Sequence, residues 1–125
     1  MLFKDFFQVK EIEEITPDTF CVTCESNRLG ISMTFNVASC MKHYVHLGET
    51  FWFTLAKTIN VCGSYECDYD SVKCGTIHVV HTPENSTTIL SAEFGRLFLS
   101  LKGDSNIFSG VTAGEDLYML LKERE

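Results

Sequence analysis

One strand-forming stretch decides the fold of this chain: FGRLFLSLKGD, residues 94–104. Apolar and polar side chains alternate through it with the period of two that is typical of a strand with one buried face. Leu97, Leu99 and Leu101 fall on the apolar face, and Phe98 is the apolar residue that interrupts the polar face. The stretch therefore predicts a strand whose leucines enter a core.

Turn signals bound this strand on both sides. Gly95 stands before it, where a backbone can bend sharply, and Gly103-Asp104 follows it. No residue of the stretch is a plausible catalyst, so its meaning is architectural. The outer face, where we expect contact with a partner protein, comprises Gly95, Arg96, Phe98, Ser100 and Lys102.

The same alternation recurs along most of the chain. Further strands are predicted at residues 7–10, 20–24, 31–37, 51–56, 72–80, 89–94 and 117–121. No segment shows a sustained helical period, and Gly75 and Gly95 suit the corners of a barrel. Because exposed strand edges are hazardous in a small all-β protein, we expect one domain over residues 1–125 that closes into an antiparallel eight-stranded Greek-key barrel of the oligonucleotide-binding (OB) type.

Composition restricts the classes of function. The chain has 125 residues, is 45% hydrophobic and carries a formal net charge of -7. Such a chain can bury roughly two thirds of its unfolded surface, which suffices for an independent core. The acidic balance argues against a protein whose main task is to follow a phosphate backbone. Without a signal-peptide pattern or an apolar run of transmembrane length, we expect a soluble, unexported protein with no membrane partner.

That expectation decides how the six cysteines are interpreted. An intracellular compartment keeps thiols reduced, so free thiols are predicted rather than a disulfide framework. The Asn85-Ser86-Thr87 triplet matches a glycosylation acceptor, but the same compartment favours a polar turn after Pro83.

Three groups of residues have spacings that could suggest a metal site. Cys21 and Cys24 are three residues apart on a predicted strand, so their side chains point to opposite faces. Residues four apart on a strand are separated by about 13 Å, which argues against a site shared by Cys74, His78 and His81. The better candidate is the loop set Cys40, His43 and His46, set against the simpler interpretation of a packed thiol and two surface imidazoles. We predict no metal site and no cofactor.

Catalytic signatures are also missing from the sequence. The paired acids Glu13-Glu14 and Asp68/Asp70 are expected in turns, as solvated charges rather than as an acid and base pair. Cysteine and histidine show no local nucleophile signature, and no glycine-rich phosphate loop is present. We therefore expect a protein that is not an enzyme and has no catalytic residues.

Aromatic residues offer weak support for nucleic-acid binding. Most of the strand phenylalanines fall on faces expected to be core. Trp52 and Tyr44 could face outward, with Lys42 and Lys57 as the nearby cations in sequence. An apolar surface that docks a protein is the stronger alternative.

Several blocks of the sequence resemble one known family. They are LFKDFFQVKEI (residues 2–12), DYDSVKCGT (68–76), FGRLFLSLKGD (94–104) and LYMLLK (117–122). In order and spacing they resemble small subunit eight, which is shared by the eukaryotic nuclear DNA-directed RNA polymerases I, II and III. The third block resembles the family's most specific signature, in which two glycines stand where this chain has Gly95-Arg96. Because arginine is less permissive in φ than glycine, we expect a bulge near Gly95.

The resemblance implies a function as well as a fold. It implies a non-catalytic component of a hetero-oligomeric nuclear RNA polymerase, an eight-stranded OB-like barrel that docks on the largest subunit and lies beside neighbouring subunits. The polymerisation chemistry and its Mg²⁺ would belong to the large subunits. Between Leu55 and Asp68 the family typically carries a long polar loop, and this chain is shorter there, from Ala56 to Cys67.

The family is also associated with non-specific binding of single-stranded DNA through the stretch that corresponds to Thr16–Cys40. Here that stretch offers Phe20, Arg28 and Phe35 as candidate contacts, and Arg28 is its one basic residue. We therefore expect no strong direct contact with nucleic acid. The alternative to a polymerase subunit is an independent OB module that binds single-stranded nucleic acid.

Overall fold

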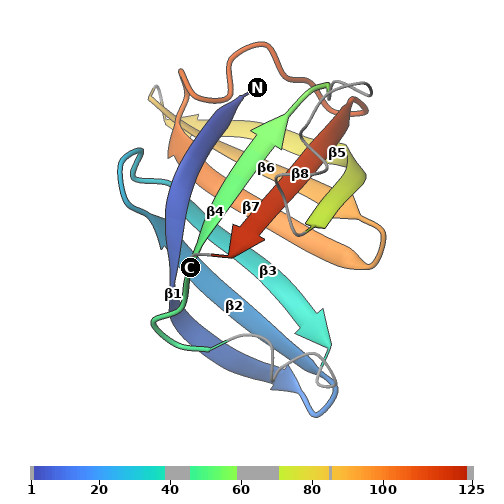
Figure 1. Cartoon of the computed structure of the whole chain (residues 1–125). Helices are drawn as coiled ribbons and strands as arrows, with labels where there is room; N and C mark the ends of the chain where they lie inside the picture. The colour runs from blue at the N-terminus through green and yellow to red at the C-terminus, as the bar shows by residue number, and fades with distance from the viewer. Residues whose placement is uncertain (1, 39–45, 59–70, 85, 124–125) are drawn as a thin grey trace.

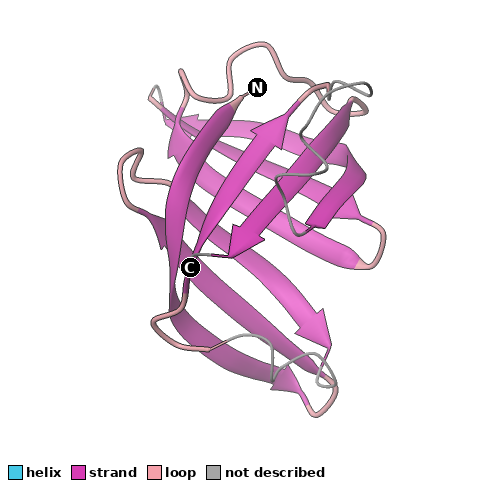
Figure 2. Cartoon of the chain, in the orientation of Figure 1, coloured by secondary structure: helices cyan, strands magenta, loops and turns pink. Residues whose placement is uncertain are grey.

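The computed structural model describes residues 2–38, 46–58, 71–84 and 86–123, and in this part of the chain the backbone forms eight strands (Figures 1 and 2). The strands are β1 (Phe3–Thr16), β2 (Thr19–Ser26), β3 (Ser32–Ala38), β4 (Thr50–Ala56), β5 (Ser71–Glu84), β6 (Thr87–Phe94), β7 (Leu97–Asp104) and β8 (Asp116–Glu123). No helix in the described residues is long and apolar enough to span a membrane.

The strands close into a barrel in the order β1-β2-β3-β7-β6-β5-β8-β4, with β4 pairing back onto β1. Every pairing among these described strands is antiparallel. β8 lies between β4 and β5, and β7 lies between β3 and β6, so the chain crosses the barrel ends in the manner of a Greek key. The predicted all-β barrel is confirmed.

The hairpin of β6 and β7 confirms the predicted strand faces. Leu99 and Leu101 are buried in the core, Leu97 packs against it, and Phe98 is 52% exposed. Their partner strand β6 alternates in the same way, with Leu90, Ala92 and Phe94 buried. Pairing of these two strands places both apolar rows on the inside, so the alternating pattern of the sequence predicts the buried faces correctly here.

Aromatic rings form one end of the core. The ring of Phe3 stacks on that of Phe53 at 5.8 Å between centroids and meets Phe108 edge-on at 6.1 Å. Phe7 contacts Phe53 edge-on at 5.5 Å. Buried aromatic pairs in these geometries add about 1 kcal/mol each beyond the burial of their area, so β1 and β4 are held together by packing as well as by their ladder.

Strand β1 is longer than the sequence predicts, and the expected placement of Glu13-Glu14 in a turn is wrong. The strand runs from Phe3 to Thr16 and so includes both acids, which are exposed. β4 pairs only with the first half of β1, whereas β2 pairs with it from Phe7 to Thr16. Pairing with β2 therefore stabilises the second half of β1, whose glutamate-rich sequence does not alternate clearly between apolar and polar residues.

The expected bulge near Gly95 is also wrong. Phe94 pairs with Leu97, so Gly95 and Arg96 form a two-residue turn that joins β6 to β7 without a register shift. Gly95 has φ +67°, and no other residue type in the described chain has a positive φ. A positive φ at the first turn position alone is the pattern of a type II′ hairpin turn, which requires glycine only there and accepts Arg96 second.

Pro83 lies inside β5, and the expected polar turn follows it where β5 joins β6. A register shift separates His81 and Glu84 in the pairing of β5 with β6, which accommodates a residue that cannot donate to the ladder. Of the triplet that follows, Ser86 is in a turn, Thr87 begins β6, and Asn85 lies outside the described residues.

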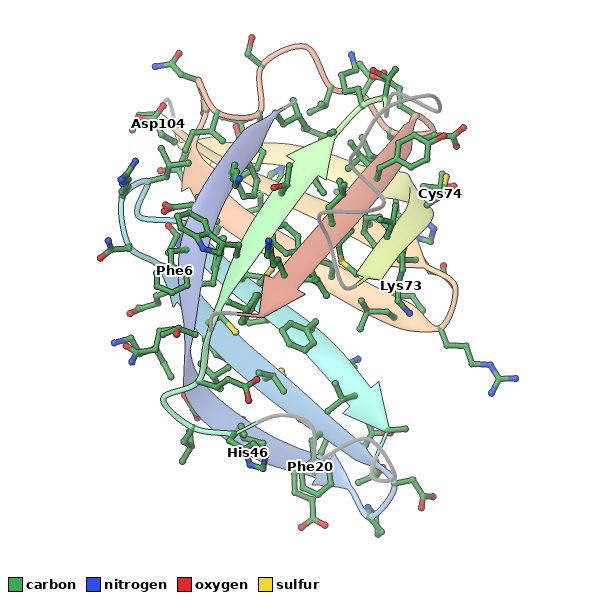
Figure 3. The ribbon with its side chains drawn as sticks, viewed as in Figure 1. Phe6, Phe20, His46, Lys73, Cys74 and Asp104 are labelled. Atoms are coloured by element: carbon green, nitrogen blue, oxygen red, sulfur yellow. The ribbon has the colours of Figure 1, made fainter. Side chains whose placement is uncertain are left out.

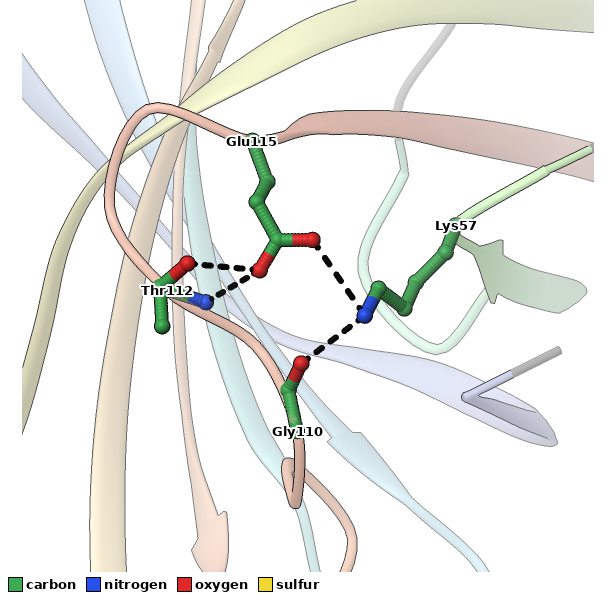
Figure 4. A network of polar contacts seen from close by, with 4 residues as sticks. All are labelled: Lys57, Gly110, Thr112 and Glu115. Atoms are coloured by element: carbon green, nitrogen blue, oxygen red, sulfur yellow. Dashed lines mark hydrogen bonds and ion pairs between the residues drawn. The ribbon is translucent and has the colours of Figure 1, made fainter.

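A polar network joins the end of β4 to the loop before β8 (Figure 4). The Lys57 ammonium lies 3.2 Å from a Glu115 carboxylate oxygen and donates to the Gly110 carbonyl at 2.8 Å. The other Glu115 oxygen accepts from the backbone N–H and the hydroxyl of Thr112, both at 2.7 Å. Hydrogen bonds from Thr112 and Lys57 lower the pKa of Glu115, so the network stays ionised at neutral pH.

Candidate functional site

A hollow opens on the outside of the barrel beside Phe98. It has a volume of about 260 Å³ and is lined by Thr34, Phe35, Asn36, His78, Ser91, Ala92, Phe98, Leu99 and Ser100. These residues come from β3, β5, β6 and β7, which are neighbours in the barrel. A side chain of a partner protein can pack into such a hollow and against the exposed aromatic ring beside it.

The hollow exists because the ladder between β3 and β7 is short. The two strands pair only over Ser32–Phe35 and Leu99–Lys102. Beyond Phe35, β3 continues to pair with β2 and extends with it past the end of the barrel (Figure 1). Small hydroxyl residues occupy neighbouring ladder positions next to the divergence, since Ser100 pairs with both Thr34 and Ser91. Their size leaves space beside the ring of Phe98.

A second exposed apolar residue borders this surface because of a bulge in β5. The register shifts between Ile77 and Val79, so Val79 pairs with Ser91 and is 49% exposed, although strict alternation from buried Ile77 predicts it inside. The adjacent His78 imidazole lies 3.2 Å from the carboxylate of Glu93. Sequence reasoning missed Val79 because a bulge depends on pairing with the neighbouring strand.

The five residues predicted to contact a partner do not all lie on one surface. Phe98 and Ser100 line the hollow, and Lys102 is exposed further along β7. Gly95 and Arg96 are exposed in the hairpin turn rather than on the strand face. We refer below to Phe98, the hollow beside it and the neighbouring Val79 as the Phe98 face.

The residues proposed for single-stranded DNA are not brought together. Phe20 is 9% exposed and Phe35 packs against the core, whereas Arg28 is exposed in the turn after β2, at the strand end opposite Phe20. Glu11 and Glu13 pair with Thr23 and Cys21 on the β1–β2 hairpin, adding negative charge beside this region.

Cysteine and histidine side chains are likewise dispersed. Burial raises the pKa of Cys24 to about 12, with a contribution from Glu49, so this thiol is protonated in the core, while Cys21 is partly buried on the same strand. His46 lies at one end of the molecule, far from Cys74 on β5 (Figure 3), and Cys40 and His43 lie outside the described residues. Within the described ranges no group of three or more His, Cys, Asp or Glu residues could hold a metal ion.

The cation beside Trp52 is Lys4 rather than the expected Lys42 or Lys57. Trp52 is half-buried on β4, where its indole stacks on Phe6 at 4.8 Å and the Lys4 ammonium lies 5.4 Å from its ring centroid. Lys57 is engaged by Glu115, and Lys42 and Tyr44 lie outside the described residues. The pairing of β1 with β4 brings Lys4 and Trp52 together across 48 residues of sequence, which no local pattern reveals.

Comparison with known proteins identifies the family. No protein-family profile matches the chain. Over 145 aligned positions that cover 98% of this chain and 97% of the relative, the chain is 30% identical to the DNA-directed RNA polymerases I, II, and III subunit rpabc3 of Dictyostelium discoideum. The chain belongs to this family of shared RNA polymerase subunits. The resemblance of the sequence blocks to a shared polymerase subunit is thereby confirmed at the level of the family.

One solved structure shows a distant likeness. A beta-barrel-like, uncharacterized protein from Brucella abortus matches the rpabc3-family chain with a TM-score of 0.32 and 9% identity, covering 95% of this chain and 72% of that one. A likeness at this level carries no argument about function.

Proposed function

We propose that this chain is a non-catalytic structural subunit of DNA-directed RNA polymerase, common to polymerases I, II and III, that acts in the nucleus and docks on the largest subunit. The observation that carries the proposal is the relationship to rpabc3 over nearly the whole length of both chains. A match of this extent relates the entire barrel, and not just one short motif, to a polymerase subunit.

The Phe98 face is the proposed contact with the largest subunit. Burial of a phenylalanine side chain from water contributes about 2 kcal/mol, and the neighbouring hollow of about 260 Å³ can receive an apolar side chain in return. Phe98 and Val79 are roughly half exposed, so about half of the surface of each residue remains to be buried on binding. Arg96 and Lys102 would lie at the rim, where charges set orientation more than affinity.

Support for a non-catalytic role comes from the family and from the placement of titratable groups. Among the described cysteines, Cys24 is protonated in the core, Cys21 is partly buried and Cys74 is exposed beside Tyr118, and the paired Glu13-Glu14 are exposed on a projecting strand. The proposed contribution of the chain is therefore protein contact, with the polymerisation reaction performed by other subunits.

Affinity purification tests the assembly directly. A tagged chain, expressed in its native cells, should co-purify in equal amount with the largest subunit of each of the three polymerases and should concentrate in the nucleus. Absence of those subunits, combined with binding to oligo(dT) that weakens steeply with salt, would contradict the proposal and favour the independent OB module.

A matched pair of substitutions tests the docking face. Phe98→Asp should leave the thermal unfolding temperature unchanged and weaken association by about 30-fold, as for the loss of a central interface residue. Leu47→Asp changes another exposed apolar residue, 66% exposed in the loop before β4, and should leave association intact. Equal recovery of the complex with both variants would place the interface elsewhere.

A further inference from the structure

The hollow beside Phe98 is polar as well as apolar. Five of its nine lining residues carry a hydroxyl, an amide or an imidazole: Thr34, Asn36, His78, Ser91 and Ser100. Phe98 supplies an exposed aromatic ring, and none of the nine residues is a lysine, an arginine or an acid. A lining of this composition narrows the kind of side chain that can fill the hollow.

The hydroxyls and the amide of the lining have unused hydrogen-bonding capacity. Ser100 pairs with Thr34 on one side and with Ser91 on the other, so three hydroxyl residues lie side by side across three strands. No side-chain hydrogen bond found among the described residues involves these three residues or Asn36. A purely apolar occupant would cover these groups without giving them a partner, which is unfavourable. The apolar side chain for which the hollow has room should therefore end in a polar group.

The nearest carboxylate to the hollow is on the β6 side. Glu93 pairs with Phe98 in the ladder between β6 and β7, and its carboxylate is partly exposed. The His78 imidazole, 3.2 Å away, neutralises this carboxylate only when it is protonated. A cation in the hollow would gain from the remaining negative charge.

Further acids lie on the β2 side of the hollow. Thr34 and Asn36 pair with Thr23 and Cys21 of β2, and these pair in turn with Glu11 and Glu13 of β1. Burial and the charges of Glu13 and Glu11 raise the pKa of Cys21, so the negative potential reaches β2.

The basic residues on this side of the barrel lie outside the lining. Lys102 is the next outward position on β7 after Ser100, Arg96 is in the hairpin turn, and Lys10 is at the bulge of β1. The whole chain carries a net charge of -7. An anionic occupant would therefore find acceptors and acids around it but no cation in the lining, whereas a cationic occupant is complementary.

We propose that the hollow receives an arginine side chain of the largest subunit, which stacks its guanidinium on the Phe98 ring and donates to the hydroxyl oxygens. The proposal rests on the docking proposed above and names the chemistry of the partner residue. Arginine combines an apolar stem with five N–H donors in one plane, so a single side chain can satisfy several acceptors and stack on an aromatic ring. Lysine has no such plane, and tyrosine has one donor and no charge.

A matched pair of substitutions in the floor of the hollow tests the sign of the occupant's charge. Ser100→Asp and Ser100→Asn add side chains of nearly the same size, and only the aspartate is charged. Cells that make the unaltered chain also express one tagged variant, and polymerase is purified through its largest subunit. The ratio of variant to unaltered chain in the polymerase, relative to the lysate, should be about fivefold higher for Ser100→Asp, because a carboxylate strengthens hydrogen bonds from a guanidinium.

The same measurement at a distant position is the control. Thr50 of β4 lies on the opposite side of the closed ring from β7, so Thr50→Asp and Thr50→Asn should be incorporated equally. Equal incorporation of the two Ser100 variants, or preference for Ser100→Asn, would overturn the arginine while leaving docking through the Phe98 face intact. Absence of even the unaltered chain from the polymerases would overturn the docking and the arginine together.

Photocrosslinking identifies the partner residue. Val79→p-benzoylphenylalanine places a photoreactive group beside the hollow, and mass spectrometry of the linked peptide should find a segment of the largest subunit that contains an arginine. Replacing that arginine by glutamine should abolish the difference between Ser100→Asp and Ser100→Asn. A linked segment without arginine, or a difference that survives the replacement, would contradict the proposal.

Discussion

Asp5 occupies a core position of β1 although its side chain is a carboxylate. It is 1% exposed, and it accepts backbone N–H groups from Phe6 at 2.7 Å, Arg28 at 3.0 Å and Leu29 at 2.8 Å. The last two belong to the turn between β2 and β3, so one side chain fastens that turn to β1. Burial by itself would raise the pKa of Asp5, but the hydrogen bonds from Leu29, Phe6 and Arg28 outweigh it and hold the pKa below its ordinary value.

Asp5→Ala should lower the free energy of unfolding by about 2 kcal/mol, because it leaves buried N–H groups without an acceptor. Urea denaturation measures this loss. Asp104→Ala is the matched control, since Asp104 accepts a single exposed N–H from Asn106 at 2.8 Å and should cost about 1 kcal/mol or less. Equal losses of unfolding free energy in the two variants would show that burial of the Asp5 hydrogen bonds contributes nothing to stability.

The lowered pKa of Asp5 also predicts a pH dependence of stability. A carboxyl whose folded pKa lies below its unfolded value stabilises the fold fully above the unfolded value, 3.8 here, and loses that contribution as pH falls through the folded pKa. The difference in unfolding free energy between the unaltered chain and Asp5→Asn should therefore be constant at neutral pH and shrink in acid. A difference that grows as the pH drops below 3.8 would reverse the assigned sign.

At the level of the strand, alternation determines which residues tolerate charge. Leu99 and Phe98 are neighbours on β7, yet Leu99 is 2% exposed and Phe98 is 52% exposed. Hydrogen bonding with β6 and β3 prevents the strand from rotating about its axis to exchange these faces.

Leu99→Asp should destabilise the barrel by more than about 4 kcal/mol, since it buries an unpaired charge in the core. Phe98→Asp should change the free energy of unfolding by less than about 0.5 kcal/mol. Thermal and urea unfolding of the two variants checks the assignment, and normal stability of Leu99→Asp would refute it.

Two glycines, one in the β6–β7 turn and one in β5, are needed for different physical reasons. A Cβ at Gly95 would meet nothing within 4 Å, so Gly95→Ala should cost only the strain of its positive φ, about 1 kcal/mol. A Cβ at Gly75 of β5 would overlap the Glu93 carbonyl oxygen and the Phe94 ring, so Gly75→Ala should cost about 3 kcal/mol. Calorimetric unfolding ranks the two, and the reverse order would contradict this distinction between strain and crowding.

For the whole molecule, closure of the barrel leaves one short seam. In the described strands β3 and β7 share four register pairs, whereas β6 and β7 share eight. Fewer cross-strand bonds give a lower free energy of local opening. The seam borders the Phe98 face, so the face proposed to contact the largest subunit lies beside the shortest ladder of the barrel.

Native-state hydrogen exchange should therefore show that amides of Ser32–Phe35 facing β7 exchange before those that join β6 to β7. In the assembled polymerase, exchange at this seam should slow if the partner covers Phe98. Earlier exchange of the amides between β6 and β7 would show that the barrel opens elsewhere.

The sequence by itself determined most of the strands and their buried faces, because alternation is a property of neighbouring residues, and its blocks indicated the family. Only the tertiary structure decided the length of β1, which depends on β2 for its second half, and the outward position of Val79, which depends on a bulge against β6. It also decided the contacts of Trp52 with Phe6 and Lys4, which lie on strands far apart in sequence. These features follow from the register between distant strands, and register is fixed only when the closed barrel satisfies every ladder at once.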